Sequence, residues 1–171
     1  MGDHDNKIAL VTGGAQGIGK GIVDVLSSEG AQVCIADISE EHGIKAVNEI
    51  EKLGRKAIYV QANFENSKEP KKVIEECVSR LGNISILVNN VGIQPSTSYK
   101  NIEETSEEVW DAIINVNLKS YFLMSKYSIP YIYKSWISLE KSREAGGLQF
   151  LYLYKTSIIL FCFFLLIQTI A

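Results

Sequence analysis

The sequence of 171 residues predicts an α/β fold with a doubly wound parallel sheet, in a single domain. Short apolar runs typical of buried strands alternate with segments that have apolar residues at helical spacing, as parallel strands joined by crossover helices require. A glycine-rich turn at residues 12–19 lies between the first strand-like run and the first helical segment. Asp37, Asn63 and Asn90 follow strand-like runs, and ligands bind at the carboxyl ends of strands in such sheets.

The first expected elements, in chain order, are a strand at 8–11, a helix from Ile18 to Gly30, a strand at 32–37, a helix at 40–53 and a strand at 57–61. The strands are apolar and rich in β-branched residues, whereas the apolar residues of the helices recur every three or four positions. Gly30 and Gly54 each end a helix, because glycine readily adopts the left-handed conformation that follows a last turn. Ser39 is expected to cap the helix at 40–53.

The later expected elements are a helix from Ser67 to Gly82, a strand at 84–88 and a long helix from about Ser106 to Ile129. Pro70 fits the first turn of its helix, because the N–H that proline lacks would have no intrahelical partner there. Thr105 and Glu108 form a capping box that would start the long helix. Pro130 is expected to end that helix.

The charge balance argues against nucleic acid as a partner. The chain has 17 basic and 20 acidic side chains, a net charge of −3, so it has no basic field to attract a phosphate backbone. Its cysteines (Cys34, Cys77 and Cys162) are few and unclustered, no metal site is predicted, and no charged-then-apolar signal segment begins the sequence. These features favour reduced thiols and a cytoplasmic location.

The glycine-rich turn predicts a dinucleotide site, because its glycines have separable tasks. Gly13 allows a tight turn, Gly17 lets the backbone approach a pyrophosphate, and Gly19 lets the helix pack closely on the strand. N–H groups at the start of the helix then face the phosphates. The alternative is a glycine-rich turn without a ligand. The strand before the turn, the helix after it and the acid after the next strand favour the dinucleotide.

Asp37, at the end of the second expected strand, predicts NAD rather than NADP as the cofactor. Its carboxylate can accept hydrogen bonds from both hydroxyls of an adenosine ribose and would repel a 2′-phosphate. Gln16 is neutral at a position where a basic side chain could bind that phosphate, which also favours NAD. The alternative is a solvated carboxylate that caps the helix region after Ser39.

Residues 12–19 (TGGAQGIG) and 89–92 (NNVG) together resemble the short-chain dehydrogenase/reductase family, whose cofactor domain carries T-G-x-x-x-G-x-G and N-N-A-G. The resemblance continues through residues 114–120 (INVNLKS), similar to the family's helix motif with its catalytic asparagine, and ends at about Pro130. It implies a Rossmann-type sheet, a nicotinamide dinucleotide, and hydride transfer between alcohols and carbonyls.

The resemblance also implies roles for individual residues. The expected contacts are Gly13, Gln16, Gly17, Ile18 and Gly19 with the pyrophosphate, Asp37 with the adenosine ribose, Asn63 and Phe64 with the adenine, and Asn90 and Gly92 with the nicotinamide-side ribose. Asn117 corresponds to the catalytic asparagine, which would relay protons through water; the alternative is a helix amide bonded to the backbone. Asn63 replaces the family's usual aspartate and Val91 its usual alanine.

The family's remaining catalytic groups, a serine and a Tyr-x-x-x-Lys, have no counterpart, since no tyrosine of the chain is followed by a lysine four residues later. In the family the tyrosine exchanges a proton with the substrate oxygen, and the lysine lowers the tyrosine's pKa. We therefore predict an NAD-binding oxidoreductase-like protein that is inactive as a truncated chain. The alternative is a non-catalytic NAD(H)-binding module, or one that pairs with a full-length relative, or forms a homo-oligomer, through the helix at 106–129.

The end of the sequence has a different composition from the rest. No acidic residue follows Leu148, and residues 158–167 are an unbroken apolar run. This run is shorter than the roughly 20 residues that a membrane-spanning helix needs, unless residues 148–154 are included. The tail has three interpretations: a packed core helix, a membrane anchor, or residues never selected for this fold, from a truncated, spliced or frame-shifted message. We expect a Rossmann dinucleotide-binding region at 1–131, a divergent linker at 132–147 and an apolar tail at 148–171.

Overall fold

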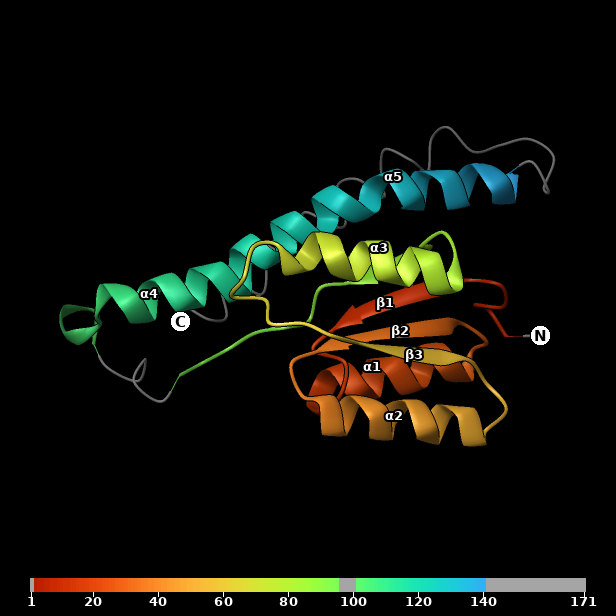
Figure 1. The fold of residues 1–171 in the computed structure, drawn as a ribbon, viewed down its shortest axis with the longest axis horizontal. Helices are drawn as coiled ribbons and strands as arrows, with labels where there is room; N and C mark the ends of the chain where they lie inside the picture. The colour runs from red at the N-terminus through yellow and green to blue at the C-terminus, as the bar shows by residue number, and fades with distance from the viewer. Residues whose placement is uncertain (1, 96–100, 141–171) are drawn as a thin grey trace.

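The fold is a parallel four-stranded sheet with helices on both faces, as the sequence predicts (Figure 1). A computed structural model describes residues 2–95 and 101–140. The strands are β1 (Ile8–Thr12), β2 (Gln32–Asp37), β3 (Ala57–Gln61) and β4 (Ile86–Val88). The helices are α1 (Gly17–Ser28), α2 (Glu40–Lys52), α3 (Glu69–Leu81), α4 (Glu107–Ile114) and α5 (Ser120–Glu140), with a 3-10 turn η2 (Ile102–Glu104) before α4 and a π-helical turn η3 (Asn115–Lys119) after it.

The strand order is β3-β2-β1-β4, so the chain moves outward from β1 to β3 and then returns to the other side of β1. β1 pairs with β2 in a register that sets Leu10 beside Cys34, and with β4 in a register that sets Leu10 beside Leu87. Because all the pairings are parallel, the carboxyl ends of the strands share one edge of the sheet. The point where β1 and β4 meet at this edge is the topological switch point, where open α/β sheets bind ligands.

Two apolar clusters lie on opposite faces of the sheet, because successive side chains of a strand point to alternate faces. Leu10 and Cys34 belong to the cluster covered by α3 and α5, and Val11 and Ile35 to the cluster covered by α1 and α2. Cys34 and Cys77 are both buried free thiols. Burial first, and then a hydrogen bond with Cys77, raises the pKa of the Cys34 thiol. The sheet therefore forms the centre of a layered core.

Two helix starts differ from the prediction. Ser39 lies at the N-cap of α2, but its hydroxyl makes no capping bond and lies 2.8 Å from Nδ1 of His42. The predicted start of α3 at Ser67 was wrong, since the helix begins at Glu69. The side chain of Asn66 accepts a hydrogen bond from the backbone N–H of Lys68 at 3.0 Å, which closes a turn before the helix.

The long helix also starts differently from the prediction. Thr105 is not the capping residue: its hydroxyl donates to the carbonyl of Asn101 at 3.1 Å. Ser106 is the N-cap, and its hydroxyl accepts from the backbone N–H of Val109 at 3.4 Å. α4 contains no buried residue and projects past the sheet (Figure 1). The N-cap therefore lies one residue later than predicted, and Val109 at the third helical position cannot complete a capping box.

Pro130 does not end the long helix, so the predicted end at Ile129 was wrong. α5 continues to Glu140, into the segment expected to be a linker. A proline inside a helix costs ~3 kcal/mol, because it lacks an N–H and its ring crowds the preceding turn. Tyr131 and Ile132, directly after the proline, pack against the core cluster that α3 covers, and this packing favours continuation of the helix.

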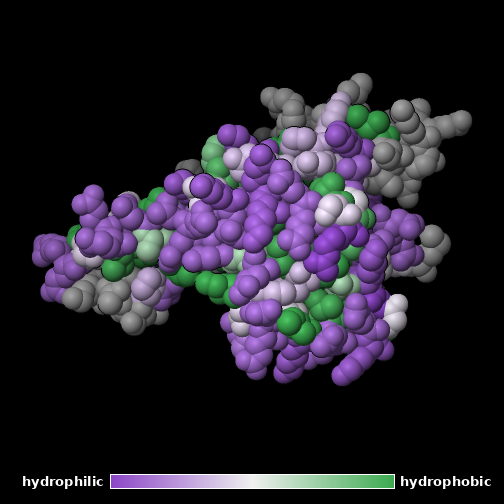
Figure 2. Space-filling model, in the orientation of Figure 1, coloured by the Kyte–Doolittle hydropathy of each residue, from purple (hydrophilic) through white to green (hydrophobic). Residues whose placement is uncertain are grey.

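The surface is mostly polar over α2 and α3 in the view of Figure 2, and apolar side chains show beside α4. Large exposed apolar residues on α4, η3 and α5 are Trp110, Leu118, Phe122, Ile129 and Tyr133. The expected linker beyond residue 140, the apolar run at 158–167 and the tail at 148–171 lie outside the described residues. In the part of the chain that the structure describes, no helix is long and apolar enough to cross a membrane.

Candidate functional site

The glycine-rich turn joins β1 to α1 and leaves the start of α1 open. Gly13 has a φ of 62°, and its N–H donates to the carbonyl of Ala36 at 2.8 Å, which ties the turn to β2. Gln16 is the N-cap of α1, and no side chain caps the helix there. Gly17 has a φ of 58°, and a Cβ at this position would have no atom within 4 Å. The start of α1 is therefore uncapped and exposed at Gln16, Gly17 and Ile18, which suits the binding of an anion.

Gly19 lets α1 lie close to the turn. A Cβ at Gly19 would overlap the carbonyl oxygen of Gly13 and lie 2.5 Å from Nδ2 of Asn90. The sequence predicted that α1 packs closely on the strand at Gly19. In the structure the atoms closest to this position belong to Gly13 in the turn and to Asn90 in the loop after β4. Ile18, next to Gly19, is 81% exposed at the start of the helix. An apolar side chain so exposed at this edge is available to contact a ligand.

Thr12 and Asn90 join the glycine turn to the loop after β4. The buried hydroxyl of Thr12 accepts from the N–H groups of Asn90 (3.0 Å) and Val91 (3.1 Å) and donates to the carbonyl of Val88 (3.3 Å). Nδ2 of Asn90 donates to the carbonyls of Thr12 and Gly13, both at 3.0 Å. The amide nitrogen of Asn90 is therefore engaged with the turn. Thr12 was predicted only as part of the turn motif, because its sequence position does not reveal these partners.

Asp37 ends β2 and is buried, with 6% of its surface exposed. Its Oδ2 accepts from the N–H of Ala15 at 3.0 Å, and its Oδ1 accepts from the N–H of Ser39 at 3.1 Å. The carboxylate thus links the glycine turn to the turn before α2, and it is buried, whereas the alternative interpretation expected a solvated one. An ionised carboxylate has about four acceptor positions, so two remain for a ligand.

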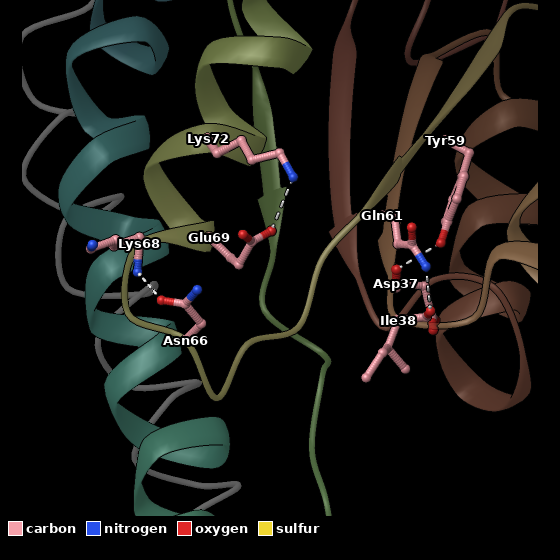
Figure 3. A network of polar contacts seen from close by, with 8 residues as sticks. All are labelled: Asp37, Ile38, Tyr59, Gln61, Asn66, Lys68, Glu69 and Lys72. Carbon is pink, nitrogen blue, oxygen red and sulfur yellow. Dashed lines mark hydrogen bonds and ion pairs between the residues drawn. The ribbon is translucent and has the colours of Figure 1, made fainter.

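Two side chains of β3 hold the backbone beyond Asp37 (Figure 3). The hydroxyl of Tyr59 donates to the carbonyl of Asp37 at 2.9 Å, and Nε2 of Gln61 donates to the carbonyl of Ile38 at 3.4 Å. Burial, and then the charges of Asp37 and Glu40, raise the pKa of Tyr59 to about 12. Sequence reasoning missed Tyr59. A signal was present in the glycine at position 43, since glycine inside a helix usually has a packing reason.

Asn63 and Phe64 follow β3 and differ in their exposure. Asn63 is exposed, and its Oδ1 accepts from the N–H of Glu65 at 3.0 Å. The side chain of Phe64 is buried in the core cluster, with 4% exposure. The ring of Phe64 therefore packs in the core and does not face a ligand. The N–H of Ala62 donates to the carbonyl of Asp37 at 3.0 Å, which places this segment beside the end of β2.

Asn117 lies in η3 and pairs with the loop after β4. Its Oδ1 accepts from the N–H of Ile93 at 2.8 Å, and its Nδ2 donates to the carbonyl of Ile93 at 3.0 Å. A Cβ at Gly92 would lie 3.6 Å from Oδ1 of Asn117. In η3 the N–H of Ser120 bonds to Asn115 and the hydroxyl of Ser120 bonds to the carbonyl of Val116. Both polar atoms of the Asn117 amide are thus bonded to the backbone of Ile93, in the loop after β4.

The structure thus brings the predicted residues together in two connected groups. The glycine turn, Asp37 and Asn90 meet at the carboxyl ends of β1, β2 and β4, whereas Gly92 and Asn117 meet at Ile93. Asn63 and Phe64 connect to the first group through the backbone of Asp37. Within residues 2–95 and 101–140, no group of His, Cys, Asp and Glu could hold a metal ion.

Comparisons with known proteins agree with this arrangement. A family model for short chain dehydrogenase matches residues 7–138, past the expected end of the resemblance at about Pro130. An uncharacterized oxidoreductase of Thermotoga maritima is 39% identical over 146 residues, covering 84% of this chain and 56% of the relative. Cyclohexanol dehydrogenase of an Acinetobacter species is 38% identical over 128 residues, covering 75% of this chain and 50% of the relative.

A solved structure shows the same fold. The short chain dehydrogenase of Burkholderia cenocepacia, solved in complex with NADP, is similar with a TM-score of 0.70 and 33% sequence identity. The match covers 74% of this chain and 51% of that chain. The chain thus spans about half of the length of the proteins that it matches.

Proposed function

Because the chain belongs to the short-chain dehydrogenase/reductase family, we propose that it binds a nicotinamide adenine dinucleotide at the carboxyl ends of β1, β2 and β4. The observation that carries this proposal is the uncapped start of α1, where a Cβ at Gly17 would meet no atom within 4 Å. Backbone N–H groups and the positive end of the helix dipole attract the dinucleotide's two phosphates to such a position. Gly13, Gln16, Ile18 and Gly19 complete the turn around them.

Asp37 supports NAD(H) over NADP(H) as the bound form. Its remaining acceptor positions suit the two hydroxyls of the adenosine ribose, and its charge disfavours a 2′-phosphate. Ile38 and Ser39, which follow Asp37, and Gln16 in the glycine turn are uncharged, so none of these three residues supplies a cation for that phosphate. The Burkholderia relative was solved with NADP, so NAD preference is proposed from the residues of this chain.

The ends of the dinucleotide would lie against the two other groups of residues. Asn63 and the backbone of Phe64 suit the adenine, because Asn63 is exposed beside the end of β2. The loop that carries Asn90 and Gly92 suits the nicotinamide-side ribose. Asn117 would hold that loop through Ile93, since both polar atoms of its amide are engaged there. When bound, the nicotinamide supplies or accepts a hydride.

The family's reaction is the exchange between small alcohols and carbonyls, and we propose that residues 1–171 supply only its cofactor site. The sequence contains no Tyr-x-x-x-Lys, so it offers no positioned proton donor for the substrate oxygen. We expect this chain alone to bind NADH and not to oxidise a simple alcohol with NAD. Steady NADH production from cyclohexanol by the purified chain would contradict this expectation.

The test of the cofactor site is a titration with NADH, followed by nicotinamide fluorescence, on two glycine variants. Gly17→Ala and Gly54→Ala both place a Cβ at a positive φ (58° and 73°) with no atom within 4 Å. Each carries the same backbone strain of ~1–2 kcal/mol, but Gly54 lies at the far end of α2. We expect Gly17→Ala to weaken NADH binding by about tenfold or more, because its methyl would occupy the phosphate position. Equal affinities for the two variants, or no binding by the wild type, would refute the proposal.

A second candidate function is that of a non-catalytic subunit. The exposed apolar side chains of α4, η3 and α5, such as Trp110 and Phe122 (52% and 61% exposed), favour a protein partner, either a second copy or a longer relative. Sedimentation of the wild type and of Phe122→Glu over a range of concentrations tests this candidate, with Lys71→Glu on α3 as the control. Association that survives Phe122→Glu would exclude this surface.

A non-catalytic subunit attached to a membrane by its tail is a variant of the second candidate function. It would replace the predicted cytoplasmic location. The apolar run at 158–167 is the feature that motivates it. It requires that the protein stay in the membrane pellet at alkaline pH, and release into the supernatant would exclude it.

A further inference from the structure

Tyr59 reaches the end of β2 from the neighbouring strand. It lies beside Ile35 in the parallel register of β2 and β3, and its side chain packs against the cluster covered by α1 and α2. Its hydroxyl donates to the carbonyl of Asp37 at 2.9 Å, and the N–H of Ala62 donates to the same carbonyl at 3.0 Å. The backbone of Asp37 is therefore held by two donors from the β3 side, one of which is a side chain.

Gly43 fixes where the ring of Tyr59 lies. A Cβ at Gly43 would overlap the ring, and it would lie 2.8 Å from Cγ of Tyr59. Gly43 is buried in the first turns of α2, and its N–H donates to the carbonyl of Ser39 at 3.0 Å. Glycine inside a helix costs up to ~1 kcal/mol relative to alanine, so the position favours glycine only because the ring lies against it. The ring thus connects β3, the end of β2 and the start of α2.

We propose that Tyr59 is a positioning residue, which holds Asp37 for the adenosine ribose and so sets the preference for NAD(H) over NADP(H). This inference rests on the proposed function of the site. The two bonds of the Asp37 carboxylate, to Ala15 and to Ser39, fix its direction only if the backbone of Asp37 is itself fixed. The hydroxyl of Tyr59 is the side-chain part of that restraint, at the same carbonyl that the N–H of Ala62 holds. Burial, and then the charges of Asp37 and Glu40, raise the pKa of Tyr59 to about 12, so the protonated hydroxyl remains a donor to this carbonyl up to higher pH than that of an ordinary tyrosine.

The experiment compares the dissociation constants of NADH and NADPH for the wild-type chain, Tyr59→Phe and Tyr133→Phe. Tyr59→Phe keeps the ring over Gly43 and removes only the hydroxyl. Tyr133→Phe makes the same chemical change on α5, where the side chain is 49% exposed and remote from Asp37. We expect Tyr59→Phe to weaken NADH binding by about two- to tenfold, the range for one hydrogen bond. NADPH binding should change less, so the ratio of the two constants should move toward one.

Gly43→Ala is a second test of the role of Tyr59, since the added methyl must displace the ring and with it the hydroxyl. We expect the ratio to move in the same direction as in Tyr59→Phe. A variant that only loses stability would weaken both ligands in proportion and leave the ratio unchanged. If wild type binds NADH and the ratio in Tyr59→Phe equals that in Tyr133→Phe, this inference is overturned while the proposed function stands. If wild type binds neither ligand, both fall.

Discussion

Replacing Gly19 by alanine should destabilise the fold, whereas the same replacement at Gly21, on the same helix, should stabilise it. A methyl at Gly19 would overlap the carbonyl oxygen of Gly13 and lie 2.5 Å from Nδ2 of Asn90. Both of these atoms are restrained, because they bond to each other at 3.0 Å. A methyl at Gly21 would meet no atom within 4 Å.

The structure sets the sign and size of the two effects. Alanine in place of glycine in a helix gains ~0.5–1 kcal/mol at either position, because glycine loses more backbone freedom on folding. At Gly21 this gain stands alone. At Gly19 an overpacking cost of ~1–3 kcal/mol opposes it, and the upper part of that range applies because the overlapped atom belongs to the backbone. We expect the free energies of unfolding of the two variants to differ by about 2–3 kcal/mol.

Urea denaturation of both variants, followed by circular dichroism, measures this difference. The slopes should match that of the wild type, since neither change alters the surface exposed on unfolding. If Gly19→Ala is as stable as Gly21→Ala, the turn is free to move away from α1, and the account of Gly19 as a close-approach position is wrong.

Three further predictions follow from the hydrogen bonds. Thr12→Val keeps the side-chain shape but removes the partner of three backbone groups, so it should cost about 2–4 kcal/mol of unfolding free energy, against less than about 1 kcal/mol for Thr105→Val near the surface. Asn117→Asp loses the donor to the carbonyl of Ile93 and sets a charge against it, so hydrogen exchange at the Ile93 amide should quicken. Asn115→Asp changes a side chain that bonds to Lys119 and should leave this exchange rate unchanged. Tyr59 has a folded-state pKa raised from 10.0 to about 12, so its stabilising contribution is complete below pH 10 and is lost as the pH rises toward 12. Unfolding free energy should therefore fall more steeply across that window in the wild type than in Tyr59→Phe.

The strands and the edge where the site lies could be predicted from the sequence. Apolar runs and glycines mark the strands and turns, and a parallel sheet necessarily brings its carboxyl ends together. The sequence alone therefore predicts that Asp37 and Asn90 lie at one edge. The partners of these side chains could not be predicted, because they depend on register and rotamer. The hydroxyl of Tyr59 meets Asp37 only because β3 pairs with β2 in one particular alignment.

The helix boundaries show a different limit. Proline disfavours the interior of a helix, and this local preference is the basis on which Pro130 was predicted to end the long helix. Tyr131 and Ile132 bury apolar surface against the core cluster, a contribution invisible from the spacing of residues along one helix. Similarly, Thr105 and Ser106 are both good capping residues, and the chain geometry selects the second. Tertiary contacts override local signals at these positions.

The three bonds of the Thr12 hydroxyl have a consequence for communication within the site. The backbone N–H groups of Asn90 and Val91 both donate to the hydroxyl of Thr12, which ends β1. The glycine turn and the loop after β4 therefore cannot loosen separately. Restricting one side lowers the entropy that the other side has left to lose, which is a form of cooperativity without a change of shape. A fragment such as AMP, which lacks the nicotinamide-side ribose and would fill only the adenosine half, should therefore slow hydrogen exchange at the Val91 amide, across the switch point from the atoms it touches.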